Sequence, residues 1–108
     1  MISSNFMRIF IFFDLPTDTA EDRKNYSIFR KKLIKLGYSM IQFSVYSKLI
    51  NVQTKKDREE KKIIKILPNN GDVRMLFVTE SQYQNIKILK GEKTLIEMIN
   101  DERKYIKL

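Results

Sequence analysis

The stretch that most limits how this chain folds is residues 7–14, Met-Arg-Ile-Phe-Ile-Phe-Phe-Asp. Alternate side chains of a strand point to opposite faces, and here both faces carry apolar bulk. Such a strand needs cover on both sides. Pro16 follows shortly after Asp14 and disfavours continuation of the strand. We therefore predict a β-strand over residues 7–14 that is covered on both faces.

Signals downstream of this strand predict further helices and strands. Asp18 and Glu21 have the spacing of a helix-starting capping box, and Gly37 is typical of a helix end. Hydrophobic periodicity and turn-forming residues place the remaining elements. We expect helices over residues 19–36 and 55–67, and strands over residues 38–50, 72–79, 85–90 and 103–108.

We interpret these elements as an α+β fold, a ferredoxin-like βαββαβ arrangement with an additional C-terminal strand. Residues 1–108 are expected to form a single domain. In this interpretation, residues 1–6 are a flexible leader, and residues 92–108 are a C-terminal extension that contributes an edge strand.

The same arrangement leaves one face of the sheet uncovered, because two helices cover only one side. Several aromatic side chains on the other side would exceed the apolar surface that a monomer usually exposes. We therefore predict a twofold homodimer packed sheet against sheet, with the tail strand added to an edge of its own sheet or exchanged with the partner. The expected interface residues, or else the set on the alternate face, are Phe10, Phe12, Tyr46, Leu76 and Val78.

Two residue types are absent from the chain, cysteine and histidine. Disulfides, thiolate metal sites, imidazole acid–base catalysis and ordinary zinc sites are therefore excluded. Any hydrolysis would depend on a hard cation such as Mg²⁺, or alternatively Mn²⁺, held by carboxylates. The longest apolar run is far shorter than the roughly 20 residues of a membrane span. We expect a cytoplasmic protein with no membrane partner.

Positive charge is concentrated between residues 23 and 65. This segment holds thirteen Lys or Arg and three acidic residues, whereas the whole chain has a net charge of +8. A single lysine here is best explained as a solvated helix residue, but the cluster as a whole favours contact with nucleic-acid phosphates. The candidate contacts are Lys24, Arg30, Lys31, Lys35, Lys55, Lys56 and Arg58.

Four strings of residues carry a family resemblance. They are Phe-Asp at 13–14, the polar segment 16–24, Gln-Phe-Ser-Val-Tyr at 42–46 and Gly-Asp-Val-Arg at 71–74. In combination they resemble the CRISPR-associated Cas-two family, most closely its type II branch, over nearly the whole chain after Met7. The resemblance implies a ferredoxin-like homodimer whose C-terminal strand can cross to a neighbour. It also implies a role in spacer acquisition, in which the dimer bridges two dimers of the Cas-one integrase on duplex prespacer DNA.

The resemblance further implies that Asp14 is the metal-binding and catalytic residue of a Mg²⁺-dependent endonuclease. From the residues alone, Asp14 is better explained as a cap on the turn before Pro16 or as a strand end in water. One carboxylate per chain is few for nuclease chemistry, because Mg²⁺ usually takes one or two carboxylates together with phosphate oxygens and waters. Asp14 of each subunit near a dimer axis would supply two.

Three functions therefore compete, and the residues leave open whether the protein is an enzyme. The first is a DNA-binding adaptor of spacer acquisition, and the second is a metal-dependent endonuclease acting on single-stranded RNA or on DNA. The third is an RNA-recognition-like module that stacks bases on strand aromatics, here Phe10, Phe12 and Phe77.

Overall fold

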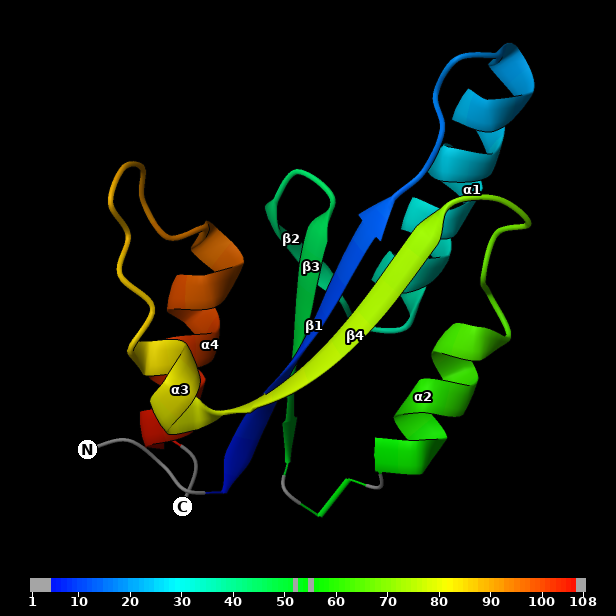
Figure 1. Cartoon of the computed structure of the whole chain (residues 1–108). Coiled ribbons are helices and arrows are strands. Elements are labelled where there is room, and N and C mark those ends of the chain that lie inside the picture. The colour runs from blue at the N-terminus through cyan, green and yellow to red at the C-terminus, as the bar shows by residue number, and fades with distance from the viewer. Residues whose placement is uncertain (1–4, 52, 55, 107–108) are drawn as a thin grey trace.

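The computed structural model describes residues 5–51, 53–54 and 56–106 of the chain. These residues form strands and helices in the order β-α-β-β-α-β-α-α (Figure 1). Their bounds are β1 Phe6–Asp14, α1 Ala20–Lys35, β2 Ser39–Gln42, β3 Val45–Asn51, α2 Lys56–Ile64, β4 Asp72–Thr79, α3 Glu80–Gln84 and α4 Leu95–Ile106. The strands make one antiparallel sheet in the order β2-β3-β1-β4. The fold is thus α+β, with β1 inside the sheet as its apolar pattern predicts.

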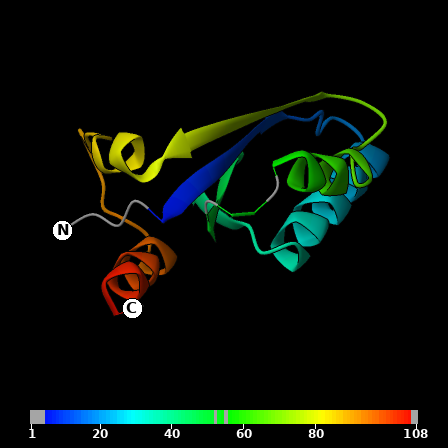
Figure 2. The same ribbon diagram turned by 90° about the horizontal axis from the view of Figure 1, so that it is seen from below.

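Helices α1 and α2 cover one face of the sheet (Figure 2). The hydrophobic core lies between this face and the two helices. Ile9, Ile11 and Phe13 of β1 point into this core. They meet Phe29 and Leu33, which lie one helical turn apart on α1 and are both buried. Burying each such side chain contributes about 1.5–3 kcal/mol, so this layer is the main source of stability.

Helix α1 begins one residue later than the sequence pattern indicates. Thr19, not Asp18, is the N-cap: its hydroxyl accepts a hydrogen bond from the backbone N–H of Asp22 at 3.0 Å. The carboxylate of Asp22 accepts in return from the backbone N–H of Thr19 at 3.2 Å. The expected box of Asp18 and Glu21 is therefore wrong by one position, because Thr19 is the residue in the extended conformation that a cap requires.

The segment expected as one strand over residues 38–50 is instead a hairpin of β2 and β3. Its turn contains Ser44 in the left-handed region, with φ 64°. The carbonyl of Ser44 accepts a hydrogen bond from the backbone N–H of Phe13 at 3.0 Å, which ties the turn to β1. A turn of this kind usually carries Gly or Asn, so the sequence gives little signal for it.

The two strands expected in the last quarter of the chain are not present among the described residues. Residues 85–90 have no strand structure, and α4 is a helix that reaches Ile106. Leu95, Ile96, Met98 and Ile99 have the spacing of one helix face, a pattern that outweighs the short alternation near the end of the chain. The expected edge strand over residues 103–108 is therefore wrong, with residues 107–108 outside the described residues. At the other end, β1 already includes Phe6, and residues 1–4 of the expected leader also lie outside the described residues.

We call the side of the sheet away from α1 and α2 the second face. Its strand residues are Arg8, Phe10, Phe12 and Asp14 of β1, Val45, Ser47 and Leu49 of β3, and Asp72, Arg74, Leu76 and Val78 of β4. In both views α3 and α4 lie on this side of the sheet (Figures 1 and 2). The chain thus covers part of its own second face.

The expected interface residues do not all lie together. Tyr46 pairs with Ile11 and is buried in the core on the other face, so its grouping with Phe10 and Phe12 is wrong. Phe10 is on the second face but only 7% exposed, because the ring of Tyr83 in α3 packs against it at 6.2 Å. Phe12 and Val78 are half-buried, and Leu76 is 49% exposed.

Candidate metal and nucleic-acid site

Asp14 lies at the exposed end of β1, directly opposite Asp72 at the start of β4. Directly opposed residues of antiparallel strands have Cβ atoms about 4.5–5.5 Å apart, and their side chains share a face. The register of β1 and β4 therefore brings a second carboxylate beside the one predicted from the sequence.

Arg74 is the cation of this strand end. Its Nε lies 2.9 Å from Asp72 Oδ1, and its Nη2 donates to Asp72 Oδ2 at 3.4 Å. The hydrogen bond and the positive charge of Arg74 lower the pKa of Asp72 below its ordinary value. Asp72 is therefore ionised at neutral pH, and its charge is partly balanced by Arg74. Asp14 forms no ion pair with the other residues that the structure describes.

A glycine makes this approach of strands sterically feasible. Gly71 has φ +104°, and a Cβ atom there would lie 2.8 Å from the carbonyl oxygen of Asp14 and 2.5 Å from Leu15 Cδ2. Any larger residue would have to displace the backbone of β1. Gly71 thus permits the loop before β4 to set Asp72 opposite Asp14.

The strand ends surround an open hollow of about 380 Å³. Its lining consists of Phe12, Phe13, Asp14, Ser44, Val45, Asp72 and Arg74. Among residues 5–51, 53–54 and 56–106, no three acidic, His or Cys side chains are grouped to hold a metal ion. The donor set still fits Mg²⁺ or Mn²⁺ bound by one or two carboxylates with water and phosphate oxygens. It does not fit a two-metal site within one chain, which needs several acids.

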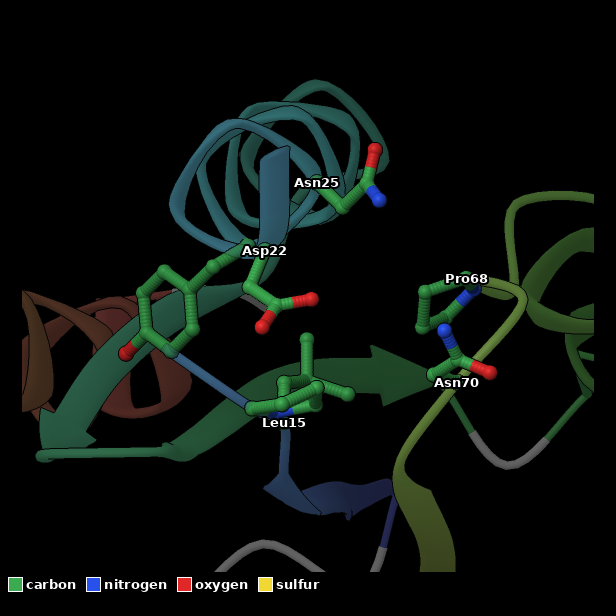
Figure 3. Close-up of a pocket in the computed structure, with 7 residues that line it drawn as sticks. Leu15, Asp22, Asn25, Pro68 and Asn70 are labelled. Carbon is green, nitrogen blue, oxygen red and sulfur yellow. The ribbon is translucent and has the colours of Figure 1, made fainter. Parts of the chain in front are cut away.

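A second hollow lies nearby, between the start of α1 and the loop before β4 (Figure 3). Asp22, Asn25 and Asn70 contribute polar groups around Leu15 and Pro68. Its volume is about 10 Å³, which is room for roughly one water molecule. Because Asp22 already serves as a helix cap, this hollow is part of the packing of α1 and not a ligand site.

The cations predicted to contact nucleic acid are exposed wherever the structure describes them. Lys24, Arg30, Lys31 and Lys35 are exposed on α1, and Lys56 and Arg58 are exposed on α2, while Lys55 lies outside the described residues. On α1, Lys24, Lys31 and Lys35 fall on the side of the helix opposite the buried Phe29 and Leu33. A ridge of positive charge therefore faces solvent.

Two other basic residues of the segment 23–65, Lys48 and Lys62, pair with a buried carboxylate of the same chain. Glu59 of α2 is buried, and its two oxygens accept hydrogen bonds from Lys48 Nζ at 2.7 Å and Lys62 Nζ at 3.1 Å. Burial alone would raise the pKa of the Glu59 carboxyl, but these hydrogen bonds and charges together lower it below its ordinary value. This cluster around the buried Glu59 has no signal in the local sequence, because it depends on the packing of α2 against β3.

The aromatic side chains do not form a common stacking surface. Phe10 is buried beneath Tyr83, and Phe77 lies on the helix-covered face against the core. The RNA-recognition-like arrangement needs such rings exposed on one face.

No described helix is long and apolar enough to cross a membrane.

Comparison with known proteins gives a consistent result. Residues 7–86 match the family described as CRISPR associated protein Cas2. A protein of Treponema denticola named CRISPR-associated endoribonuclease Cas2 is 50% identical over 97 residues, covering 90% of this chain and 96% of that protein. A protein of the same name from Campylobacter jejuni is 40% identical over 102 residues, covering 94% of this chain and 71% of that protein. One from Ligilactobacillus salivarius is 45% identical over 87 residues, covering 81% of this chain and 86% of that protein.

The matched segment begins at the start of the buried strand and runs through β4 and α3. It includes Asp14, Asp72 and Gly71, which together build the strand-end site. The resemblance in the residues and the matches to the family and its relatives agree. The chain belongs to the CRISPR-associated Cas2 family.

Proposed function

We propose that this protein is a nucleic-acid-binding adaptor of CRISPR spacer acquisition. In this proposal it adopts the ferredoxin-like arrangement, pairs as a twofold homodimer, holds duplex prespacer DNA and bridges dimers of the Cas-one integrase. The observation that carries the proposal is the ridge of exposed cations on α1, with further cations at the start of α2.

The charge argument favours binding over catalysis. Thirteen basic and three acidic residues lie between positions 23 and 65, and most of the basic side chains are exposed on helices. Regularly spaced surface cations neutralise backbone phosphates without reading sequence, which suits a protein that must accept any prespacer. The strand-end site offers two carboxylates per chain, fewer than a self-sufficient nuclease centre needs.

Pairing through the second face is supported by its uncovered half. Phe12 is half-buried and Leu76 is 49% exposed there. Phe12 is the residue of β1 next to Asp14 on this face, so a twofold axis at this end would bring together carboxylates from two chains. Apolar strand surface of this kind is removed from water when two sheets pack face to face.

The test is the salt dependence of binding to a fluorescent DNA duplex, followed by anisotropy. A variant with Lys24→Gln, Lys31→Gln and Lys35→Gln is expected to bind more weakly. Each lost phosphate contact should flatten the slope of log K against log salt by about 0.9. The matched control is Lys87→Gln with Lys90→Gln, which removes exposed cations outside α1 and α2. Equal binding by the wild type and the α1 variant would refute the proposal.

A second function, Mg²⁺-dependent endoribonuclease activity, is favoured by the facing carboxylates and by the names of the relatives. Asp14 would hold the cation, with Asp72 beside it and Arg74 placed to contact a phosphate. The chain has no histidine to act as a base, so a cation held there would supply the Lewis acidity that activates water. Purified wild type should cleave single-stranded RNA with Mg²⁺, and Asp14→Asn should not. Equal cleavage by both proteins would identify a contaminating nuclease.

A further inference from the structure

The second face carries two arginines in very different surroundings, and the first is Arg8 of β1. Arg8 is 0% exposed, and its Nη2 lies 3.0 Å from Asp101 of α4 and 3.4 Å from Glu80 of α3. Its guanidinium carbon lies 3.8 Å from the centre of the Tyr83 ring. A buried cation that loses its partners is costly, so Arg8 is fixed in place and serves the fold.

The second arginine, Arg74 of β4, is held only by an exposed pair. Its side chain is 78% exposed, and that of its partner Asp72 is 56% exposed. Water and salt compete with such a pair, so it contributes little net free energy. The guanidinium of Arg74 can therefore leave Asp72 at small cost, which Arg8 cannot do with its own partners.

Arg74 is placed to exchange Asp72 for a phosphate. It lies two residues from Asp72 on the same strand, so both side chains are on the second face. The register sets Asp72 opposite Asp14 and Arg74 opposite Phe12, and these four residues line the hollow of about 380 Å³. A guanidinium binds phosphate oxygens with the same fork of N–H donors that it offers to a carboxylate.

The pair also limits what Asp72 can offer to a cation. Both of its oxygens accept from Arg74, at 2.9 Å and 3.4 Å. With Arg74 in this position, the two carboxylates and one guanidinium of the strand end have a net charge of −1. If Arg74 turned away, a cation would meet the full −2 of Asp14 and Asp72. The affinity of a carboxylate site for a divalent cation rises with the charge of its ligands.

We propose that Arg74 is a movable arm that couples binding of a phosphodiester to binding of a divalent cation. In the free protein the arm holds Asp72. When a phosphodiester of single-stranded nucleic acid enters the hollow, Arg74 turns to the phosphate and leaves Asp72 to join Asp14 in holding the cation. Each ligand thereby favours the other by the same factor. This inference rests on the proposed endonuclease site at Asp14.

The first test measures cation binding alone, by electron paramagnetic resonance of free Mn²⁺ at about 0.15 M ionic strength, where distant charges are screened. Arg74→Gln should bind Mn²⁺ about two- to fivefold more tightly than the wild type, which is the range of one exposed ion pair. In the Asp72→Asn background the same substitution should have a much smaller effect. Unchanged affinity in Arg74→Gln would overturn the arm. Equal effects in both backgrounds would also overturn it, because direct repulsion between Arg74 and the cation does not require Asp72.

The second test adds the phosphodiester, as a short fluorescent single-stranded RNA with 2′-O-methyl groups, followed by anisotropy. In the wild type, Mn²⁺ should raise the affinity for this RNA, and the RNA should raise the affinity for Mn²⁺ by the same factor. In Arg74→Gln this factor should be about two- to fivefold smaller. The same factor in both proteins would show that direct contact between cation and phosphate accounts for the coupling, and would overturn the arm.

Two further variants serve as controls. Lys87→Gln removes an exposed cation outside the hollow, so its Mn²⁺ affinity and its coupling factor should equal those of the wild type. A change like that of Arg74→Gln would indicate a general charge effect and overturn the arm. Asp14→Asn should lose Mn²⁺ binding. If it binds Mn²⁺ as tightly as the wild type, or if the wild type does not bind, the proposed endonuclease site is refuted, whereas lost binding there with no effect of Arg74→Gln refutes the arm alone.

Discussion

The buried Glu59 and the half-buried Lys48 form an ion pair, with 2.7 Å between Oε1 and Nζ, that joins α2 to β3. Lys62 occupies the second oxygen of the same carboxylate at 3.1 Å. Both oxygens are therefore satisfied, which is the condition for a buried charge to stabilise a fold. The cluster connects the strand β3 to the helix α2, two elements whose side chains follow different periodicities.

Replacing Glu59 with Gln should lower the free energy of unfolding by about 1.5–3 kcal/mol at pH 7, because charge-assisted hydrogen bonds are lost. The pKa of Glu59 is lowered in the folded chain, so its contribution is complete above the unfolded pKa, near 4.3, and fades as pH falls through the folded pKa. The difference between wild type and variant in urea unfolding should therefore narrow below about pH 4. Glu60→Gln, at an exposed neighbour, is the control and should change little at any pH.

Gly71→Ala should destabilise the protein more than Gly91→Ala. Both glycines have a positive φ, +104° and +100°, so both variants carry a backbone cost of roughly 1–2 kcal/mol. Only at position 71 does the added Cβ meet other atoms, and this overlap should add about 1–3 kcal/mol. Thermal unfolding of the two variants provides the comparison. Equal losses would mean that the loop shifts without strain.

Asp14→Asn should stabilise the metal-free protein by roughly 0.2–1 kcal/mol, because like charges directly opposite each other on neighbouring strands repel. The gain should shrink in about 1 M NaCl. Asp18→Asn makes the same charge change in a loop with no facing acid and serves as the control. Urea unfolding in low salt measures both, and a loss of stability in Asp14→Asn would show that its carboxylate has a structural partner.

Mg²⁺ should stabilise the wild type and not the Asp14→Asn variant. At ten times its dissociation constant, a cation that binds only the folded state adds about 1.4 kcal/mol to the free energy of unfolding. Thermal unfolding with Mg²⁺, and with the chelator EDTA as the reference, separates this effect from ionic strength when NaCl is matched. An equal response in both proteins would place the cation away from Asp14.

The elements that the sequence predicts well are those with local signals. The strand expected over residues 72–79 coincides with β4. The strand expected over residues 7–14 begins one residue earlier in the structure, as β1. The helix expected over residues 19–36 is one residue shorter at each end, as α1. Alternation, a capping residue and a glycine at the helix end are all read from a few neighbouring positions.

What the sequence does not reveal depends on contacts between distant residues. Ser44 adopts a left-handed conformation without the usual Gly or Asn, so the hairpin has no local marker. Arg8 and Asp101 are 93 positions apart, and nothing near Arg8 distinguishes it from an exposed strand cation. For the same reason the sequence indicates that Asp14 ends a strand, whereas the position of Asp72 opposite it depends on the register of β1 and β4.

The two carboxylate oxygens of Glu97 have different hydrogen-bond partners: one caps the start of α4, and the other links α4 to α3. Oε1 accepts from the backbone N–H of Thr94, completing a capping box, while the other oxygen meets the hydroxyl of Tyr83. Because α3 follows β4 directly, Tyr83 can reach its position against β1 only after β4 has paired with β1 in the sheet. During synthesis α4 should therefore become ordered last, on a sheet that is already complete. Until that moment Arg8 lacks Asp101, one of the two carboxylates that pair with it in the folded chain.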